Sequence, residues 1–436
     1  MATETKIPFD ETYIRTFSSG RGEPEWLTAR RLEALERAER LPLPKPDKTK
    51  IEKWNFHGFA RHTVESAAYA SLDDLPDAVK ALIEAGEETK NLYVQRNHTP
   101  AYVSLSEELK EKGVIFTDIL TAAREHGDLL ERYWMTAVKP DEHRLAALHA
   151  ALMNGGVFVY VPKNVEIETP LQAVYIQDED DIALFNHVIV VAEDNSRVVF
   201  VENYLSADRN GQASANIVAE VFANANARVF FAAVDHLASG VTTYVNRRGI
   251  AGRDGRIEWA LGLMNDGNTV SENITRLVGD GSFGDTKTVV VSRGEQVQNF
   301  TTSVVHYGKH TEGYILKHGV VRDSATSIFN GIGKIEHGAS KSNAEQESRV
   351  LMLSEKARGD ANPILLIDED DVMAGHAASV GRVDPIQLYY LMSRGIPRRE
   401  AERLIIHGFL APVVEAIPID GVKNQLIEVI ERKVQS

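Results

Sequence analysis

The chain has 436 residues, of which 43% are hydrophobic and 25% charged, and its formal net charge is −15. This composition allows a large core and two or three domains, and the acidic balance argues against nucleic acid as the main partner, because phosphate binding needs a concentrated basic surface. No apolar run approaches the roughly 20 residues of a membrane span and no secretion signal opens the chain, so we expect a cytoplasmic protein without a membrane partner.

Helices are predicted in the first third of the chain, which we treat as an N-terminal helical or mixed segment, residues 1–155. In "GEPEWLTARRLEALERAERL", Trp26, Ala29, Leu32 and Leu35 recur every three residues, which is typical of an amphipathic helix. The prolines of "LPLPKPDK" end it. Two further helices are expected in "TDILTAAREHGDLLERYWM" and "DEHRLAALHAALMNG".

The middle of the chain, residues 156–384, is a series of short β-rich runs. Examples are "HVIVVA", "RVVFVENYL", "ARVFFAAV" and "TKTVVVS", separated by small turns containing Gly, Asn or Asp. No segment of helical length and period intervenes. The pattern suits two β-sandwich domains or one long parallel β-helix, and periodicity does not choose between them.

Helices are predicted again in the C-terminal domain, residues 385–436. Asp384 is a favourable N-cap, Pro385 suits the first helical position and Gly395 suits the residue after the helix. The next helix, "PRREAERLIIHGFLAPVVEAI", is expected to break or kink at Pro412. The last, "GVKNQLIEVIERKV", repeats an apolar residue at every fourth position.

Several motifs resemble nucleotide-binding or metal-binding motifs but have simpler structural interpretations. "GDGSFG" is followed by a strand and not by the helix that a dinucleotide site needs, so it predicts a turn. "NGIGK" is too short for a phosphate loop. His306 and His310 are interpreted as structural, because histidine ligands usually come with a third protein ligand. The two "DEDD" runs, residues 178–181 and 368–371, are interpreted as solvated turns.

His376 lies in "AGHAASVG", where its neighbours are all small. A core histidine usually has large apolar neighbours, whereas small neighbours would let another chain or a small inorganic group approach. Single histidines are nevertheless more often hydrogen-bonded scaffold than ligands. The local sequence therefore favours a structural role and leaves the ligand role open.

Nearly the whole chain resembles the SufB/SufD family of iron–sulfur cluster assembly proteins. The most specific block is "HAASVGRVD" followed by "YYLMSRG", and "EPEWLTARRLEALERAERLPLPKPDKTKIEKWNF" and "GGVFVYVPKNVEIETPLQAVY" resemble the same family. The resemblance implies a mainly β protein: a right-handed parallel β-helix core flanked by N-terminal and C-terminal α-helical segments. It also implies a non-catalytic subunit of a SufB–SufC–SufD assembly scaffold.

Because the chain contains no cysteine, it resembles the SufD-type members of this family more than the SufB-type members. SufB-type chains carry a cysteine where we align Ala357, and SufD-type chains often carry one where this chain has Ala374. A chain without thiolates cannot supply cysteine ligands to a cluster. The resemblance leaves His376 as the candidate iron or cluster-assembly ligand at the SufB interface. We expect no cofactor bound tightly by this chain alone, and a transient Fe–S cluster or iron in complex with SufB.

The resemblance also implies two partners. The pairing edge for SufB is expected in "NPILLIDEDDVMAG", at Pro363, Ile364, Leu365, Leu366 and Ile367. Docking of the SufC ATPase is expected on an apolar anchor with a basic rim, formed by Arg394, Arg398, Arg399, Leu404, Ile405 and Phe409. The isolated chain could form a homodimer. The alternative function is a β-helix carbohydrate-active enzyme, a lyase or hydrolase.

Overall fold

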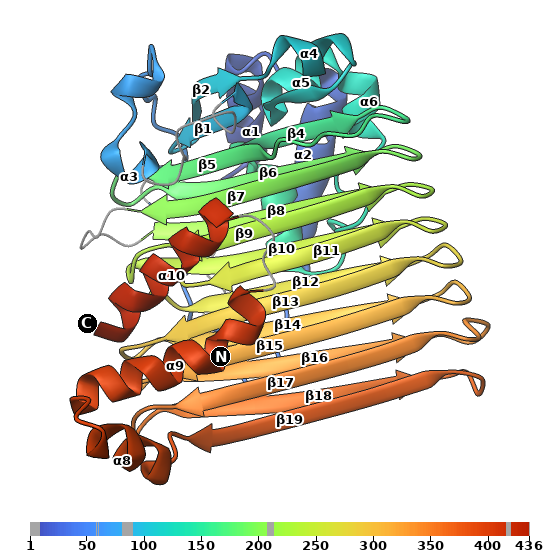
Figure 1. Ribbon diagram of the computed structural model, residues 1–436. Coiled ribbons are helices and arrows are strands. Elements are labelled where there is room, and N and C mark those ends of the chain that lie inside the picture. Colours follow the sequence, from blue (N-terminus) through green and yellow to red (C-terminus); the bar gives the residue numbers. More distant parts are fainter. Residues whose placement is uncertain are drawn as a thin grey trace.

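The computed structural model describes residues 9–57, 59, 61–80, 90–206, 213–415 and 420–435. Its centre is a long parallel β-solenoid whose strands stack in two facing sheets, with helices at both chain ends (Figure 1). From β4 onward, neighbours within a sheet are two strands apart in sequence, because the chain crosses to the other sheet after each strand. The expected mainly β fold with a parallel β-helix core is confirmed, and the sandwich alternative is excluded.

The first sheet has ten strands, ordered β19-β17-β15-β13-β11-β9-β7-β5-β1-β2. Its strands are β1 (Leu92–Arg96), β2 (Thr99–Ser104), β5 (Leu171–Gln177), β7 (Arg197–Ser206), β9 (Arg228–His236), β11 (Arg256–Leu263), β13 (Phe283–Ser292), β15 (Glu312–Val321), β17 (Asn343–Met352) and β19 (Met373–Arg382). Every pair is parallel except β1 and β2.

The second sheet has nine strands, ordered β18-β16-β14-β12-β10-β8-β6-β4-β3. Its strands are β3 (Ile115–Asp118), β4 (Gly155–Val161), β6 (Ala183–Ala192), β8 (Ala213–Ala223), β10 (Val241–Ala251), β12 (Thr269–Leu277), β14 (Val297–His306), β16 (Thr326–Ile335) and β18 (Arg358–Ile367). Only β3 is antiparallel to its neighbour. One end of the solenoid is thus closed by the antiparallel strands β2 and β3.

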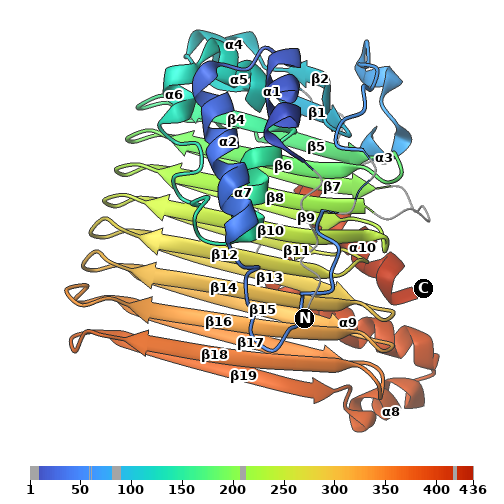
Figure 2. The same ribbon diagram turned by 180° about the vertical axis from the view of Figure 1, so that it is seen from behind.

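Helices flank the solenoid on the outer faces of both sheets and at its two ends (Figure 1). They are α1 (Glu11–Gly20), α2 (Glu25–Arg40), α3 (Asp77–Lys80), α4 (Glu107–Glu111), α5 (Ile119–Glu125), α6 (Gly127–Glu131), α7 (Arg144–Leu152), α8 (Pro385–Ser393), α9 (Arg398–Val414) and α10 (Asp420–Gln435), with a short 3-10 helix at Leu72–Asp74. Side chains of α2 and α7 share a core with the nine-stranded sheet (Figure 2), and α9 and α10 share one with the ten-stranded sheet. Among the described residues, no helix is long and apolar enough to cross a membrane.

A repeated turn sets the register of the solenoid. Asn164, Asn195 and Asn226 have left-handed backbones, with φ of 61°, 58° and 55°. Asparagine tolerates this conformation because its short side chain bonds locally. The Asn195 side-chain amide donates to Asn164 Oδ1, and the Asn226 side-chain amide donates to Asn195 Oδ1. Each hydrogen bond is 3.0 Å long and joins residues 31 positions apart. This ladder stacks successive turns, so it is the internal repeat that we did not detect in the sequence.

Several boundaries differ from the sequence predictions. The runs at β10, β12, β16 and β19 were not predicted as strands, because polar and small residues interrupt their apolar pattern. Three strands of the N-terminal segment, β1 to β3, join the same two sheets as the core.

The helices differ from expectation in two places. The single helix expected in "TDILTAAREHGDLLERYWM" is divided into α5 and α6 at His126. Helix α9 continues through Pro412 to Val414, so the expected break is absent there. Near the end of a helix, a proline removes only one of the last hydrogen bonds.

The interior between the sheets combines an apolar core with buried polar side chains, and it holds a buried ion cluster. Arg247 on β10 reaches Glu202 on β7 and Asp235 on β9, with Nη2 2.7 Å from Glu202 Oε1 and 2.6 Å from Asp235 Oδ1. All three side chains are at most 1% exposed. Burial raises the pKa of Glu202 to about 7, although the nearby Arg247 acts to lower it.

Candidate functional site

The solenoid ends at β18 and β19, and each of these strands pairs on one side only among the described residues. Strand β18 pairs with β16, and β19 pairs with β17. The opposite end is closed by antiparallel strands, so the two ends differ. An unpaired edge offers a row of free N–H and C=O groups to another chain.

The hydrogen-bond pattern shows which backbone groups are free on β19. The Met373 N–H donates to the Ser342 carbonyl over 2.9 Å, and in a parallel ladder alternate residues bond to the same neighbour. The odd-numbered residues of β19 therefore bond to β17. Ala374, His376, Ala378 and Val380 direct their N–H and C=O groups to the open edge.

The same reasoning explains the proline in β18. The Arg358 N–H donates to the Ala325 carbonyl over 3.0 Å, so the even-numbered residues bond to β16. Pro363 is an odd-numbered residue and lacks an N–H only at the open edge, the position where an edge strand tolerates proline. Continuous pairing by an added strand is interrupted there, whereas the β19 edge has no proline.

His376 lies on the interior side of this open end. It is in register with Gln346 on β17, which is buried and donates from Nε2 to the Ile364 carbonyl over 2.8 Å. Residues in register on parallel strands share a face. No further strand covers β19, so the imidazole itself is exposed, as is nearly all of the strand.

No hydrogen bond or ion pair joins His376 to another described residue, and this separates it from the scaffold histidines. His306 Nδ1 lies 2.7 Å from Thr311 Oγ1, and His318 Nδ1 donates to the Phe409 carbonyl over 2.7 Å. Both are buried. His306 is thus structural, as predicted, while His376 lacks the contacts that a scaffold role requires.

The described residues contain no group of three or more His, Asp or Glu side chains placed to hold a metal ion. With no cysteine in the chain, His376 can supply one ligand only, and a complete iron or cluster site would need donors from another chain. Ala357 directly precedes β18 and Ala374 is the second residue of β19, and neither side chain offers a ligand atom.

The other motifs have the structural roles that we expected. "GDGSFG" forms the turn between β12 and β13, where Gly281 has a φ of 70°. "NGIGK" lies within β16. The first "DEDD" run joins β5 to β6 and the second joins β18 to β19, where Lys341 binds Asp371 over 2.8 Å.

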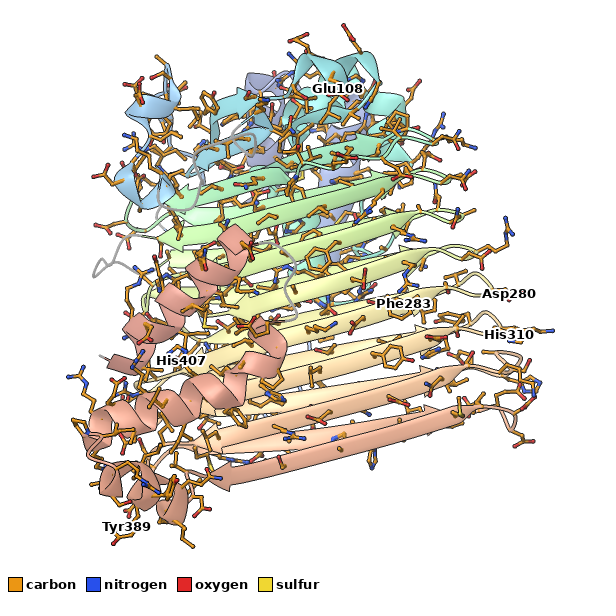
Figure 3. All side chains as sticks on the ribbon, viewed as in Figure 1. Glu108, Asp280, Phe283, His310, Tyr389 and His407 are labelled. Atoms are coloured by element: carbon orange, nitrogen blue, oxygen red, sulfur yellow. The ribbon has the colours of Figure 1, made fainter. Side chains whose placement is uncertain are left out.

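The C-terminal helices begin directly after β19. Asp384 caps α8 by accepting the Ile386 N–H over 2.8 Å, and Gly395 ends the turn after it with a φ of 84°. Helix α8 has no buried residue. Its exposed side chains include Ile386 at 76% and Tyr389 at 73% exposure, and Tyr389 projects away from the sheets in Figure 3.

The six residues expected to dock the ATPase do not share one surface. Arg394 and Arg398 are exposed, and Leu404 is 42% exposed. Arg399 is also exposed. Ile405 and Phe409 instead pack against the ten-stranded sheet, and the Phe409 ring stacks on His318 with ring centres 5.0 Å apart.

The sequence analysis missed the apolar surface of α8, which comprises Ile386, Tyr389, Tyr390 and Met392. Its signal is present in "PIQLYYLMS", where apolar residues occur on all sides of a short helix. A helix of that kind is normally buried on every side, so its exposure here leaves a large apolar surface of the type found at interaction sites.

Comparison with known proteins assigns the family. The SUF system FeS cluster assembly SufBD core domain matches residues 175–409, and the SufBD protein N-terminal region matches residues 88–173. The iron-sulfur cluster assembly protein SufD of Bacillus subtilis is 69% identical over 437 residues, covering 100% of both chains. SufBD family proteins of Staphylococcus haemolyticus and Staphylococcus saprophyticus are 28% and 26% identical, each covering 94% of this chain and 90% of the relative. The chain belongs to the SufB/SufD family of iron–sulfur cluster assembly proteins.

Proposed function

We propose that this chain is a non-catalytic subunit of an iron–sulfur cluster assembly scaffold that pairs with a SufB-type chain and binds the SufC ATPase. The observation that carries the proposal is the open last turn of the solenoid, where an exposed, unbonded His376 faces the direction from which a partner must come. The alternative, a carbohydrate-active enzyme, gains no support from the family.

The pairing surface is the edge of β19 together with the free positions of β18. Four successive open positions on β19 can each accept and donate a backbone hydrogen bond, and their side chains are small except for His376 and Val380. A partner strand can therefore approach closely. On β18, Leu365 and Ile367 fall on the interior side of the same end and supply the apolar part of the junction.

The iron or cluster is the cargo of this junction and not a resident cofactor. A neutral imidazole is a borderline nitrogen ligand suited to iron, and His376 presents one at the interface. Thiolates from the SufB-type partner would supply the remaining ligands, because this chain has none. Cluster binding would accordingly require the pair of chains.

The ATPase would dock on the exposed surface formed by α8 and the start of α9. Ile386, Tyr389 and Leu404 provide apolar area, and Arg394 and Arg398 provide a basic rim. Exposed aromatic residues beside arginine are the residue types enriched at protein interfaces. Ile405 and Phe409 support this surface from beneath by holding α9 on the sheet.

The proposal is tested by coexpression with SufB and SufC and affinity capture of this chain. Ala378→Pro removes a free N–H at the open edge without removing a bond to β17, so it should abolish capture of SufB while the melting temperature stays within a few degrees of the parent. Ala378→Ser, which keeps the N–H, is the matched control. Capture of SufB at the parent level by the proline variant would contradict pairing through β19.

A further inference from the structure

Three arginines stand in register on the outer face of the ten-stranded sheet. Arg197, Arg228 and Arg256 are the first residues of β7, β9 and β11, and each is paired with the next across the parallel ladder. The residues that follow them, such as Val198 and Val229, lie in the interior core. Side chains alternate along a strand, so the arginines point outward.

Acidic residues flank this arginine ladder, with Glu166 beside Arg197, Glu258 two residues after Arg256 and Glu312 beyond Phe283, but none stands between the three arginines in their row. None of the three forms an ion pair with another described residue, although Glu166 forms a backbone bridge beside Arg197. Like charges directly opposite each other destabilise a sheet. Elsewhere the solenoid pairs opposite charges between turns, as with Lys163 and Asp194 at 3.0 Å.

The ladder borders the half of the face that the chain's own helices leave uncovered. Helices α9 and α10 cover residues late in the strands, such as Val234, Val289 and Val320. The labelled Phe283 lies on the half without helices in Figure 3, and the Arg256 guanidinium lies 3.9 Å from the centre of its ring. The half-buried Phe230, two residues after Arg228, packs against the cluster that α9 and α10 share with the sheet, so it marks where the covered half begins.

The spacing of the ladder distinguishes between two forms of acidic partner. Neighbouring strands lie about 4.8 Å apart, so the outer two arginines are about 9.6 Å apart. Carboxylates at positions i, i+4 and i+7 of a helix span about 10.5 Å along its axis. Alternate residues of an extended strand would span about 13 Å over the same three contacts, which fits less well.

We propose that the ladder binds an acidic amphipathic helix of a partner protein, lying along the stacking direction of the solenoid. The chain itself shows that helices can pack in this direction, since α2 and α7 run across successive strands of the opposite face (Figure 2). The site uses neither the open end nor the C-terminal helices, so it stands apart from the function proposed above.

The test is fluorescence polarisation of two labelled 18-residue peptides with the full chain. One peptide places its three glutamates at i, i+4 and i+7, and the other has the same composition with the glutamates distributed around the helix. The chain is used as the parent, as Arg197→Gln/Arg228→Gln/Arg256→Gln, and as the matched control Arg15→Gln/Arg37→Gln/Arg40→Gln, whose arginines are exposed on α1 and α2.

We expect the first peptide to bind the parent and the control equally, and the ladder variant at least tenfold more weakly, with affinity falling as salt is raised. The ladder variant should melt no lower than the parent, because a like-charge contact has been removed. Equal binding of the two peptides, or competition by single-stranded DNA at equal charge, would overturn the proposal in favour of a general polyanion surface. Unchanged peptide binding by the ladder variant, or a clear loss of its stability, would also overturn it.

Discussion

Replacing Arg247 with methionine tests whether the buried ion cluster holds the two sheets together. The guanidinium makes four hydrogen bonds of 2.6 to 3.0 Å to Glu202 and Asp235. Methionine fills much of the same volume but offers no donor. The variant therefore leaves two carboxylates in the interior without a cation.

The expected cost is about 3 to 5 kcal/mol of unfolding free energy, the range found when one partner of a buried ion pair is removed. The cost should depend on pH. Since burial raises the folded-state pKa of Glu202 to about 7, above its usual 4.5, its stabilising contribution is complete below pH 4.5 and is lost as pH rises through about 7. Without Arg247 this pKa rises further, so the difference between variant and parent should be larger at pH 8 than at pH 5.

Urea unfolding followed by the β-sheet circular dichroism signal measures both effects. The triple variant Arg247→Met/Glu202→Gln/Asp235→Asn is the matched control, because it removes the two unpaired carboxylates as well as the cation. It should recover more than half of the lost stability and its pH dependence should flatten. A single variant within 1 kcal/mol of the parent at pH 8, or no recovery in the triple variant, would refute the reasoning.

Three further results are expected. His376→Ala should change the unfolding free energy by no more than ~0.5 kcal/mol, because the side chain is exposed and makes no hydrogen bond. It should nevertheless lower the Fe–S absorbance when the complex with SufB is reconstituted. A destabilised complex with a normal cluster yield would show that His376 is scaffold. Ile386→Ser/Tyr389→Ser should weaken capture of SufC without a change in melting temperature, and capture at the parent level would move the docking surface elsewhere. Gly156→Ala should destabilise the chain by more than ~4 kcal/mol. A Cβ at this position would lie 1.9 Å from the His187 carbonyl oxygen, and the backbone φ is 128°. Thermal unfolding tests this, and a melting temperature equal to that of the parent would contradict it.

The local sequence predicted those elements whose signal lies within the element itself. The helix at α2 was found from its apolar spacing, and the capping residues Asp384 and Gly395 mark α8 as expected. The strands β6, β7 and β9 were found because each contains an uninterrupted apolar run, VIVVA, VVFV and VFFAAV respectively. The strands β16 and β19 were missed because glycine, asparagine and alanine replace the β-branched residues that mark a strand.

The candidate site was predicted in part. His376 was selected from its small neighbours and from family resemblance, and the structure places it at the open end. The apolar surface of α8 was missed because a helix that is apolar all round looks buried in sequence. Ile405 and Phe409 were placed on a docking surface because apolar residues near arginines have the composition of an interface, but composition does not show which of them the fold buries.

The sequence by itself determined that this chain is a β-rich protein with helical ends, without thiolate chemistry and without a nucleotide loop. Only the tertiary structure decided which strands are neighbours. Parallel partners lie about 30 residues apart, and their register depends on the stacked turn residues and on interior packing, not on local propensity. That register aligns His376 with Gln346, brings Arg197, Arg228 and Arg256 into one row, and leaves β19 as the last, uncovered strand.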